Sequence, residues 1–164
     1  MSPSRPPARP PHRAWMGLAL DAAVLTRASA AVPIGAVVVG PDGEVLGTGW
    51  NQREELGDPT AHAEVQAIRA ASARRGAWRL EGCTLVVTLE PCAMCAGASV
   101  LARIPRVVFG AWDEKAGASG SVFDVLRERR LNHWTEVVAG VREEECALLL
   151  TEFFAAQRSG SGPG

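Results

Sequence analysis

Residues 83–110 decide the fold class and read CTLVVTLEPCAMCAGASVLARIPRVVFG. The runs at 83–88 and 106–110 are continuously apolar, which is typical of strands buried on both faces. The segment 92–104 between them predicts a helix, and Pro105 ends it because proline cannot continue the ladder of helical hydrogen bonds. Two buried strands joined by a helix indicate an α/β domain.

The remaining segments complete the predicted architecture. Two β-branched runs joined by a PDG turn predict a hairpin over about residues 34–51. Asp58 fits an N-cap, and Pro59 suits the first position of a helix that ends near Gly76. The other predicted elements are an amphipathic helix near 15–25, a short helix near 122–130, a strand near 136–139 and a final helix over about 142–157. Together they predict one domain, residues 14–158, built as a three-layer α/β/α sandwich with a mixed five-stranded sheet and helices on both faces.

The first helix follows a basic tail, which raises the alternative of a secretory signal peptide. Asp21 interrupts the apolar stretch and Arg27 follows it, which argues against that alternative. The predicted core-facing stripe of the helix consists of Trp15, Leu18, Ala22 and Leu25. No run approaches the roughly 20 apolar residues of a membrane helix. We therefore expect a cytoplasmic protein without a membrane segment.

Composition sets broad limits on the class of protein. The chain has 164 residues, of which 47% are hydrophobic and 21% charged, and this excludes a wholly disordered chain. Four cysteines are too few for a disulfide scaffold. The net charge of −1 argues against a generic nucleic-acid binder, although the predicted disordered, Arg/Pro-rich tail at 1–13 carries +3 and the remainder −4. Residues 159–164, SGSGPG, predict a flexible C-terminus.

Two short motifs carry metal-binding chemistry: HAE at 62–64 and PCAMC at 91–95. Cys92 and Cys95 are three residues apart, so at a helix start they share a face, and the helix dipole favours their thiolate forms. His62 adds a borderline-soft third ligand. Two thiolates and one imidazole suit one Zn²⁺ per chain, and three protein ligands leave a fourth position for water. A fully structural zinc site would normally be closed by four ligands, so this pattern indicates a catalytic one.

Glu64 indicates what the water is for. Zinc lowers the pKa of bound water from about 15.7 to about 7, and an attacking water needs a group to take its proton and deliver it to the leaving group. A carboxylate two residues from a ligand is close enough for that role. Because residues i and i+2 diverge on a regular helix, we expect Glu64 to approach the water from the side rather than bind the metal.

The pattern H-x-E…P-C-x-x-C is the signature of zinc nucleobase deaminases. The chain resembles the bacterial tRNA-specific adenosine deaminases of the zinc-dependent cytidine/deoxycytidylate deaminase superfamily, over about residues 14–155. The blocks that carry the resemblance are DPTAHAEVQAI (58–68), VTLEPCAMCAGA (87–98), RVVFGAWDEKAGASGS (106–121) and LNHWTEV (131–137). The resemblance implies a cytidine deaminase-like fold, a homodimer and a tRNA anticodon stem-loop as partner.

The same resemblance implies the reaction and the substrate contacts. Adenosine at the wobble position would become inosine with release of ammonia, with Glu64 as the catalytic acid and base. Asn51, Asp113, Lys115 and His133 would contact the substrate. Plainer roles stay open for them: Asn51 closing the hairpin, Asp113 and Lys115 in a solvated loop, and His133 capping a turn.

Two other functions fit the motifs. A deaminase of a free base or nucleoside, such as guanine, cytosine or cytidine, would share the zinc signature. An inactive, zinc-stabilised RNA-binding partner protein would share the ligands, but Glu64 argues against it, because such partners tend to lose the carboxylate. Cys83 and Cys146 lie outside the motif and are expected to be small buried core residues.

Overall fold

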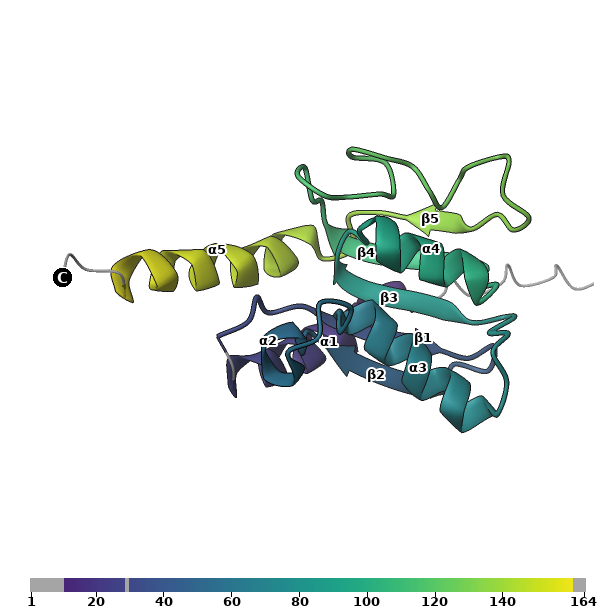
Figure 1. The fold of residues 1–164 in the computed structure, drawn as a ribbon, viewed down its shortest axis with the longest axis horizontal. Coiled ribbons are helices and arrows are strands. Elements are labelled where there is room, and N and C mark those ends of the chain that lie inside the picture. Colours follow the sequence, from purple (N-terminus) through teal and green to yellow (C-terminus); the bar gives the residue numbers. More distant parts are fainter. Residues whose placement is uncertain (1–10, 29, 161–164) are drawn as a thin grey trace, which may run out of the picture.

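The computed structural model describes residues 11–28 and 30–160, arranged as Figure 1 shows. The predicted tail lies mostly outside the described residues, as do positions 161–164. Residues 12–13 already belong to the first helix, and residues 159–160 still belong to the last, so both helices are longer than predicted. The elements are α1 (His12–Val24), η1 (Leu25–Ala28), β1 (Gly35–Val39), β2 (Val45–Trp50), α2 (Arg53–Leu56), α3 (Ala63–Arg75), β3 (Thr84–Leu89), α4 (Ala93–Leu101), β4 (Arg106–Ala111), β5 (Glu136–Val138) and α5 (Glu143–Gly160).

The strands form one mixed sheet in the order β2-β1-β3-β4-β5. β1 is antiparallel to both β2 and β3, whereas β3, β4 and β5 run parallel. The predicted hairpin is β1–β2, and the predicted strand–helix–strand unit is β3–α4–β4. The mixed five-stranded sheet is therefore confirmed, and α4 begins at the edge where β3 ends.

Helices cover both faces of this sheet, which confirms the three-layer prediction (Figure 1). Alternate residues of β1 face opposite layers. Ala36 and Val38 belong to the core beneath α3 and α4, whereas Val37 and Val39 belong to the core shared with α1 and the start of α5. Cys83 and Cys146, 0% and 1% exposed, are the expected small core residues, one in each layer.

The stripe predicted for the first helix is only half right: Ala22 is buried and Trp15 packs against the core, but the two leucines are exposed. Leu18 and Leu25 are 41% and 52% exposed. The residues of α1 that are buried are Met16, Ala19, Ala22 and Ala23. A Cβ atom on Gly35 of β1 would lie 2.0 Å from the Ala19 carbonyl oxygen, so α1 meets the strand there at backbone contact distance and only small residues fit between them. Close approach, rather than the spacing of the largest residues, selects the buried face.

The helix predicted near residues 122–130 is also absent. The described chain forms an irregular loop there, with a single bridge between Ser119 and Asp124. Carbonyl oxygens of Gly117 and Ala118 accept hydrogen bonds from the amides of residues 122, 123 and 125. Farther along, the Leu126 carbonyl oxygen, which a helix would pair with the amide of residue 130, accepts a hydrogen bond from the Thr135 amide instead. Fully buried Leu126 anchors the loop to the core.

Asp58 does not cap a helix. Its Oδ1 accepts hydrogen bonds from the Thr60 amide and hydroxyl at 2.8 and 2.7 Å, which closes a local turn. The helix begins later, at Ala63, and His62 is its N-cap with extended backbone angles (φ −70°, ψ 154°). The chain between the hairpin and α3 also forms the short helix α2, which the sequence pattern did not predict.

α5 extends well beyond the sheet (Figure 1). Cys146, in its first turn, is buried in the core, and most residues farther along are exposed. At 18 residues α5 is the longest helix in the described part of the chain. Neither α5 nor any other helix there is long and apolar enough to span a bilayer.

Two glycines of β2 allow α3 to lie close to the sheet. A Cβ atom on Gly49 would lie 2.2 Å from the Ala63 carbonyl oxygen. One on Gly47 would lie 2.3 Å from the carbonyl oxygen of Ala67. Real Cβ atoms do not approach backbone so closely, so the position of α3, and of His62 at its start, depends on these glycines.

We predict that Gly49→Ala destabilises the protein by about 1–3 kcal/mol, because the added methyl group pushes α3 from β2. Denaturant unfolding followed by circular dichroism measures the change. Gly97→Ala is the matched control: Gly97 lies within α4 with no atom within 4 Å of an added Cβ. That change is expected to stabilise by about 0.5–1 kcal/mol. Equal stability of Gly49→Ala and the unchanged protein would contradict the close packing described here.

Candidate metal centre

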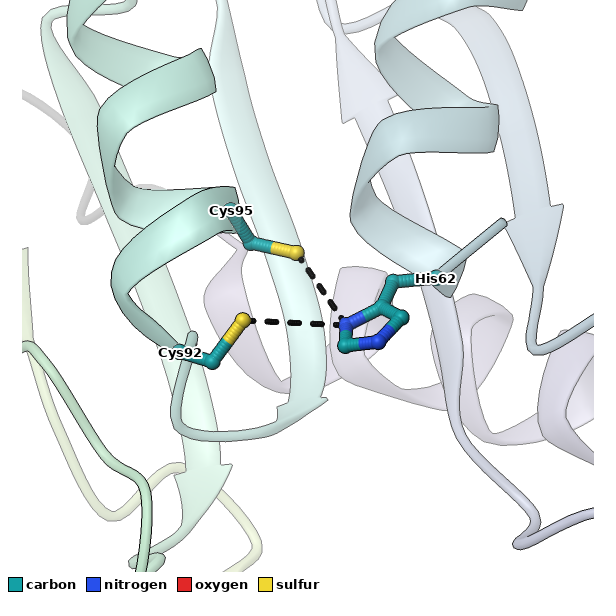
Figure 2. A group of neighbouring side chains, drawn as sticks. All are labelled: His62, Cys92 and Cys95. Carbon is teal, nitrogen blue, oxygen red and sulfur yellow. Dashed lines mark hydrogen bonds between the residues drawn. The ribbon is translucent and has the colours of Figure 1, made fainter. Parts of the chain in front are cut away.

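The candidate metal centre lies where the starts of two helices meet. His62 is the N-cap of α3, and Cys92 is the N-cap of α4 with extended backbone angles (φ −74°, ψ 177°). Cys95 lies in the first turn of α4. Figure 2 shows the two sulfur atoms directed toward the His62 ring across the gap between the helices. The structure therefore brings together all three predicted ligands.

The distances fit a tetrahedral ion. His62 Nδ1 lies 3.7 Å from Cys92 Sγ and 3.6 Å from Cys95 Sγ (Figure 2). Bond lengths of about 2.3 Å from zinc to sulfur and about 2.05 Å to nitrogen, at a tetrahedral angle, require about 3.6 Å between nitrogen and sulfur. The ligand atoms all lie within 4.8 Å of one another. The donor set and its spacing therefore fit zinc.

The charges of the site favour a thiolate. Hydrogen bonds from Cys95 and His62 lower the pKa of the Cys92 thiol to about 3, against the opposing effect of burial. The hydrogen bond with Cys92 likewise raises the pKa of His62. The positive ends of the α3 and α4 dipoles meet at the same place and stabilise negative charge there. The site thus offers soft thiolate ligands and a favourable electrostatic environment to a cation.

Glu64 lies beside the ligands as predicted. It is 4% exposed, and its Oε2 accepts a hydrogen bond from the Cys95 thiol at 3.2 Å. His62 is extended rather than helical, so residues 62 and 64 need not diverge as they would within a helix. Burial raises the pKa of the Glu64 carboxyl, which suits a group that both accepts and donates a proton.

A cavity of about 530 Å³ opens beside the centre. It includes three predicted site residues besides His62, namely Asn51, Asp113 and Lys115. The other lining residues are Val32, Ile34, Arg53, Ala63, Leu89, Trp112, Glu114, Ala116, Leu150 and Phe154. The cavity therefore combines apolar walls with a few polar groups, as small-molecule and nucleobase sites do.

Asn51 has a fixed orientation at this cavity. Its Nδ2 donates to the Val32 carbonyl oxygen at 3.1 Å, and its Oδ1 accepts from the Arg53 amide at 3.1 Å. The second bond closes the turn after the hairpin, which is the structural role that the sequence also allowed for Asn51. One N–H and one lone pair of the amide remain for a ligand, so both roles are compatible.

His133 lies elsewhere. Its Nε2 is 2.7 Å from the carbonyl oxygen of Ile104, in the connection that leads into β4. β3 and β4 run parallel. The metal centre lies near the C-terminal end of β3, where α4 begins, whereas this connection lies at the N-terminal end of β4. The two are therefore at opposite ends of the strands. The structure thus places His133 against the connection that leads into β4 and does not bring it to the cavity. Turn capping and substrate contact by His133 both stay predictions.

Several contributors to the site were missed from the sequence. Trp112 stacks edge-to-face on Phe109 at 4.9 Å and forms part of the cavity wall. Leu150 and Phe154 reach the cavity from α5, more than 50 residues beyond the cysteines in sequence. Their apolar character alone could not distinguish a cavity wall from core. Glu90 was also overlooked, although a carboxylate directly before the PCAMC motif is a detectable signal.

Comparisons with known proteins now bear on this geometry. The model of the cytidine and deoxycytidylate deaminase zinc-binding region matches residues 10–111. The chain belongs to this deaminase family. A tRNA-specific adenosine deaminase from Bacillus subtilis is 54% identical to this deaminase over 127 residues, which cover 77% of this chain and 78% of the relative.

Solved structures resemble this deaminase over most of their length. A tRNA:A34 deaminase, from a study of A-to-I editing at the wobble position, has a TM-score of 0.80 and 44% identity, covering 84% of this chain and 99% of that one. A guanine deaminase from Nitrosomonas europaea has a TM-score of 0.71 and 26% identity, covering 87% and 84%. The cytidine deaminase-like fold and the zinc cofactor of this deaminase are thus confirmed.

We predict that His62→Ala abolishes stoichiometric zinc binding, because two thiolates alone leave the tetrahedral site half filled. Elemental analysis of the purified variant measures the metal per chain. His133→Ala is the matched control, since it removes a histidine remote from the centre and should retain one zinc per chain. A full zinc complement in His62→Ala would show that His62 is not a ligand.

Proposed function

We propose that the protein deaminates adenosine to inosine at the wobble position of a tRNA anticodon and releases ammonia. The observation that carries this proposal is the buried carboxylate of Glu64, hydrogen-bonded to Cys95 of the candidate zinc site, whose ligand His62 lines the cavity. The resemblance to proteins that are named tRNA-specific adenosine deaminases supports tRNA as the substrate.

The chain's own residues carry the proton transfers. His62, Cys92 and Cys95 would hold the zinc ion, which would supply the Lewis-acid chemistry that activates the attacking water. Glu64 accepts the proton of the attacking water and donates it to the purine ring nitrogen. Glu64 then takes the remaining proton from the hydroxyl group added at C6 and transfers it to the C6 amine. The C–N bond breaks, ammonia leaves, and the C6 oxygen becomes the carbonyl of inosine. The raised pKa of the Glu64 carboxyl suits these transfers.

Cavity walls orient the base. The fixed amide of Asn51 presents a donor and an acceptor to a purine edge. Val32, Ile34 and Leu89 supply apolar surface for its ring. A base in a single-stranded anticodon loop reaches such a cavity at small cost, because little stacking has to be broken.

A second concavity favours a polynucleotide over a free base. It measures about 420 Å³, is lined by Lys115, Phe154, Gln157 and Arg158, and shares Lys115 and Phe154 with the first. Two cationic side chains and an aromatic ring suit phosphate contact and base stacking. A substrate with nucleotides on either side of the reactive base would use both concavities, whereas free guanine would occupy only the first.

We also propose that the enzyme acts as a homodimer in the cytoplasm and takes the anticodon stem-loop as its binding partner. The support for these statements is the resemblance to the tRNA-specific adenosine deaminases. Exposed apolar side chains away from the cavity, such as Leu101 at 69% exposed, leave surface that a second chain can cover.

The proposed function is tested by incubating the zinc-loaded protein with an anticodon stem-loop that carries a wobble adenosine and, separately, with guanine and cytidine. We predict inosine in the stem-loop, detected by mass spectrometry of the digested RNA, together with released ammonia. Ammonia from guanine or cytidine alone would favour the free-base reaction and overturn the proposal.

Glu64→Gln is the control for this assay. The amide keeps the shape of the side chain but cannot exchange a proton, so turnover should fall by at least about 100-fold with zinc and folding retained.

Phe154→Ala tests the second concavity. We predict that KM for the stem-loop rises about fivefold or more, since stacking on one aromatic side chain contributes about 1–3 kcal/mol per base. Steady-state kinetics measures the change. Leu148→Ala removes a similarly exposed apolar side chain of α5 that does not line either concavity and should leave KM unchanged. Equal KM values for the two variants would show that Phe154 does not contact the RNA.

A further inference from the structure

Glu90 is a buried carboxylate that the reaction described above does not use. It is 2% exposed and lies between the end of β3 and Pro91, two residues before the zinc ligand Cys92. It does not line the cavity. A buried charge is costly unless it is fully hydrogen-bonded, so its partners indicate what it does.

All the side-chain partners of Glu90 belong to the loop after β4. Its Oε1 accepts a hydrogen bond from the Asp113 amide at 3.0 Å. Its Oε2 accepts from the amides of Ser119 and Ser121, each at 3.0 Å. The Ser121 hydroxyl donates to Oε1 as well. The Glu90 side chain is therefore hydrogen-bonded to both ends of the segment 113–121.

The loop lies directly on this carboxylate. A Cβ atom on Gly117 would lie 2.3 Å from Glu90 Oε1 and 2.5 Å from the Asp113 carbonyl oxygen. The Ala118 amide donates to the Pro91 carbonyl oxygen at 2.8 Å, and Gly117 forms a bridge with Cys92. The turn that carries a zinc ligand and the loop are thus bound together along their length.

The cavity wall depends on this anchorage. Asp113, held by Glu90 through its amide, accepts hydrogen bonds at Oδ1 from the amides of Lys115 and Ala116 at 3.1 and 3.2 Å. Residues 112–116 form one side of the cavity, and Lys115 also borders the second concavity. Glu90 therefore determines where that wall lies relative to the zinc ligands.

We propose that Glu90 is a positioning residue for the substrate: its carboxylate holds the 113–121 loop on the zinc-ligand turn and so sets the RNA-binding wall of the cavity. The proposal rests on the proposed function, because it takes the stem-loop as substrate. It assigns Glu90 to substrate binding rather than to zinc binding or proton transfer.

Glu90→Gln tests this role. The amide keeps the shape, but its NH₂ group faces backbone N–H donors and cannot accept their hydrogen bonds. We expect KM for the stem-loop to rise at least about tenfold, kcat to change less than about threefold and zinc to stay at one per chain. Hydrogen exchange should accelerate in residues 113–121 and not in α3. Glu81→Gln, which alters an exposed carboxylate paired with Arg79, is the matched control and should behave like the unchanged protein.

Ser121→Ala is a second, milder variant, which removes one hydroxyl donor and leaves the backbone amides in place. We expect a KM increase of about two- to threefold. If Glu90→Gln fails to fold, this variant decides the question. Unchanged KM in either folded variant, or loss of zinc from Glu90→Gln, would overturn the proposal. Hydrogen exchange does not require turnover, so it tests the anchorage even if the unchanged protein fails to deaminate the stem-loop and the proposed function is wrong.

Discussion

The starts of α3 and α4 have to meet within a few ångström, and most of the structure can be understood as satisfying that requirement. The ligand atoms of His62 and Cys95 are 3.6 Å apart although 33 residues separate them in sequence. Gly47 and Gly49 let α3 lie against β2 at backbone contact distance. The parallel pair β3–β4 sets the start of α4 at the sheet edge where the cavity opens.

The same requirement explains how the two helices begin. His62 and Cys92 occupy N-cap positions, where serine, threonine or aspartate would normally accept a backbone hydrogen bond, and neither makes a side-chain cap. Each omission costs about 1 kcal/mol of helix stability. In return both side chains stand at the positive end of a helix dipole, which favours the Cys92 thiolate and the neutral His62 imidazole, the forms that bind zinc. The missing caps lower the stability of the two helix starts, and a bound metal ion would offset this loss because its binding stabilises the folded state.

The sequence predicted the parts of this structure that depend on local pattern. Continuous apolar runs identified β3 and β4, and the PDG turn identified the hairpin. The motifs identified the zinc ligands and Glu64, because short spacings at helix starts restrict geometry strongly. Features that depend on contacts between distant segments were missed or wrong. The buried face of α1 follows from Gly35 of β1. The loop that replaces the expected helix near 122–130 is held by contacts outside that segment, such as the hydrogen bond from the Thr135 amide to the Leu126 carbonyl oxygen. No local sequence pattern indicates which residues Glu90 binds or that Phe154 lines the cavity.

The weak negative net charge also becomes intelligible from the structure. A net charge of −1 argues against a protein that binds nucleic acid over a broad basic surface. The charges around the cavities are distributed differently. Arg53 and Lys115 border the first concavity together with Asp113 and Glu114, whereas Lys115 and Arg158 are the charged residues that border the second. The nearby carboxylates Glu64 and Glu90 are buried and held in hydrogen bonds, so they contribute little repulsion at the surface. A short single-stranded loop needs only this local arrangement, because recognition then rests on one inserted base and a few flanking phosphates rather than on the whole molecular surface.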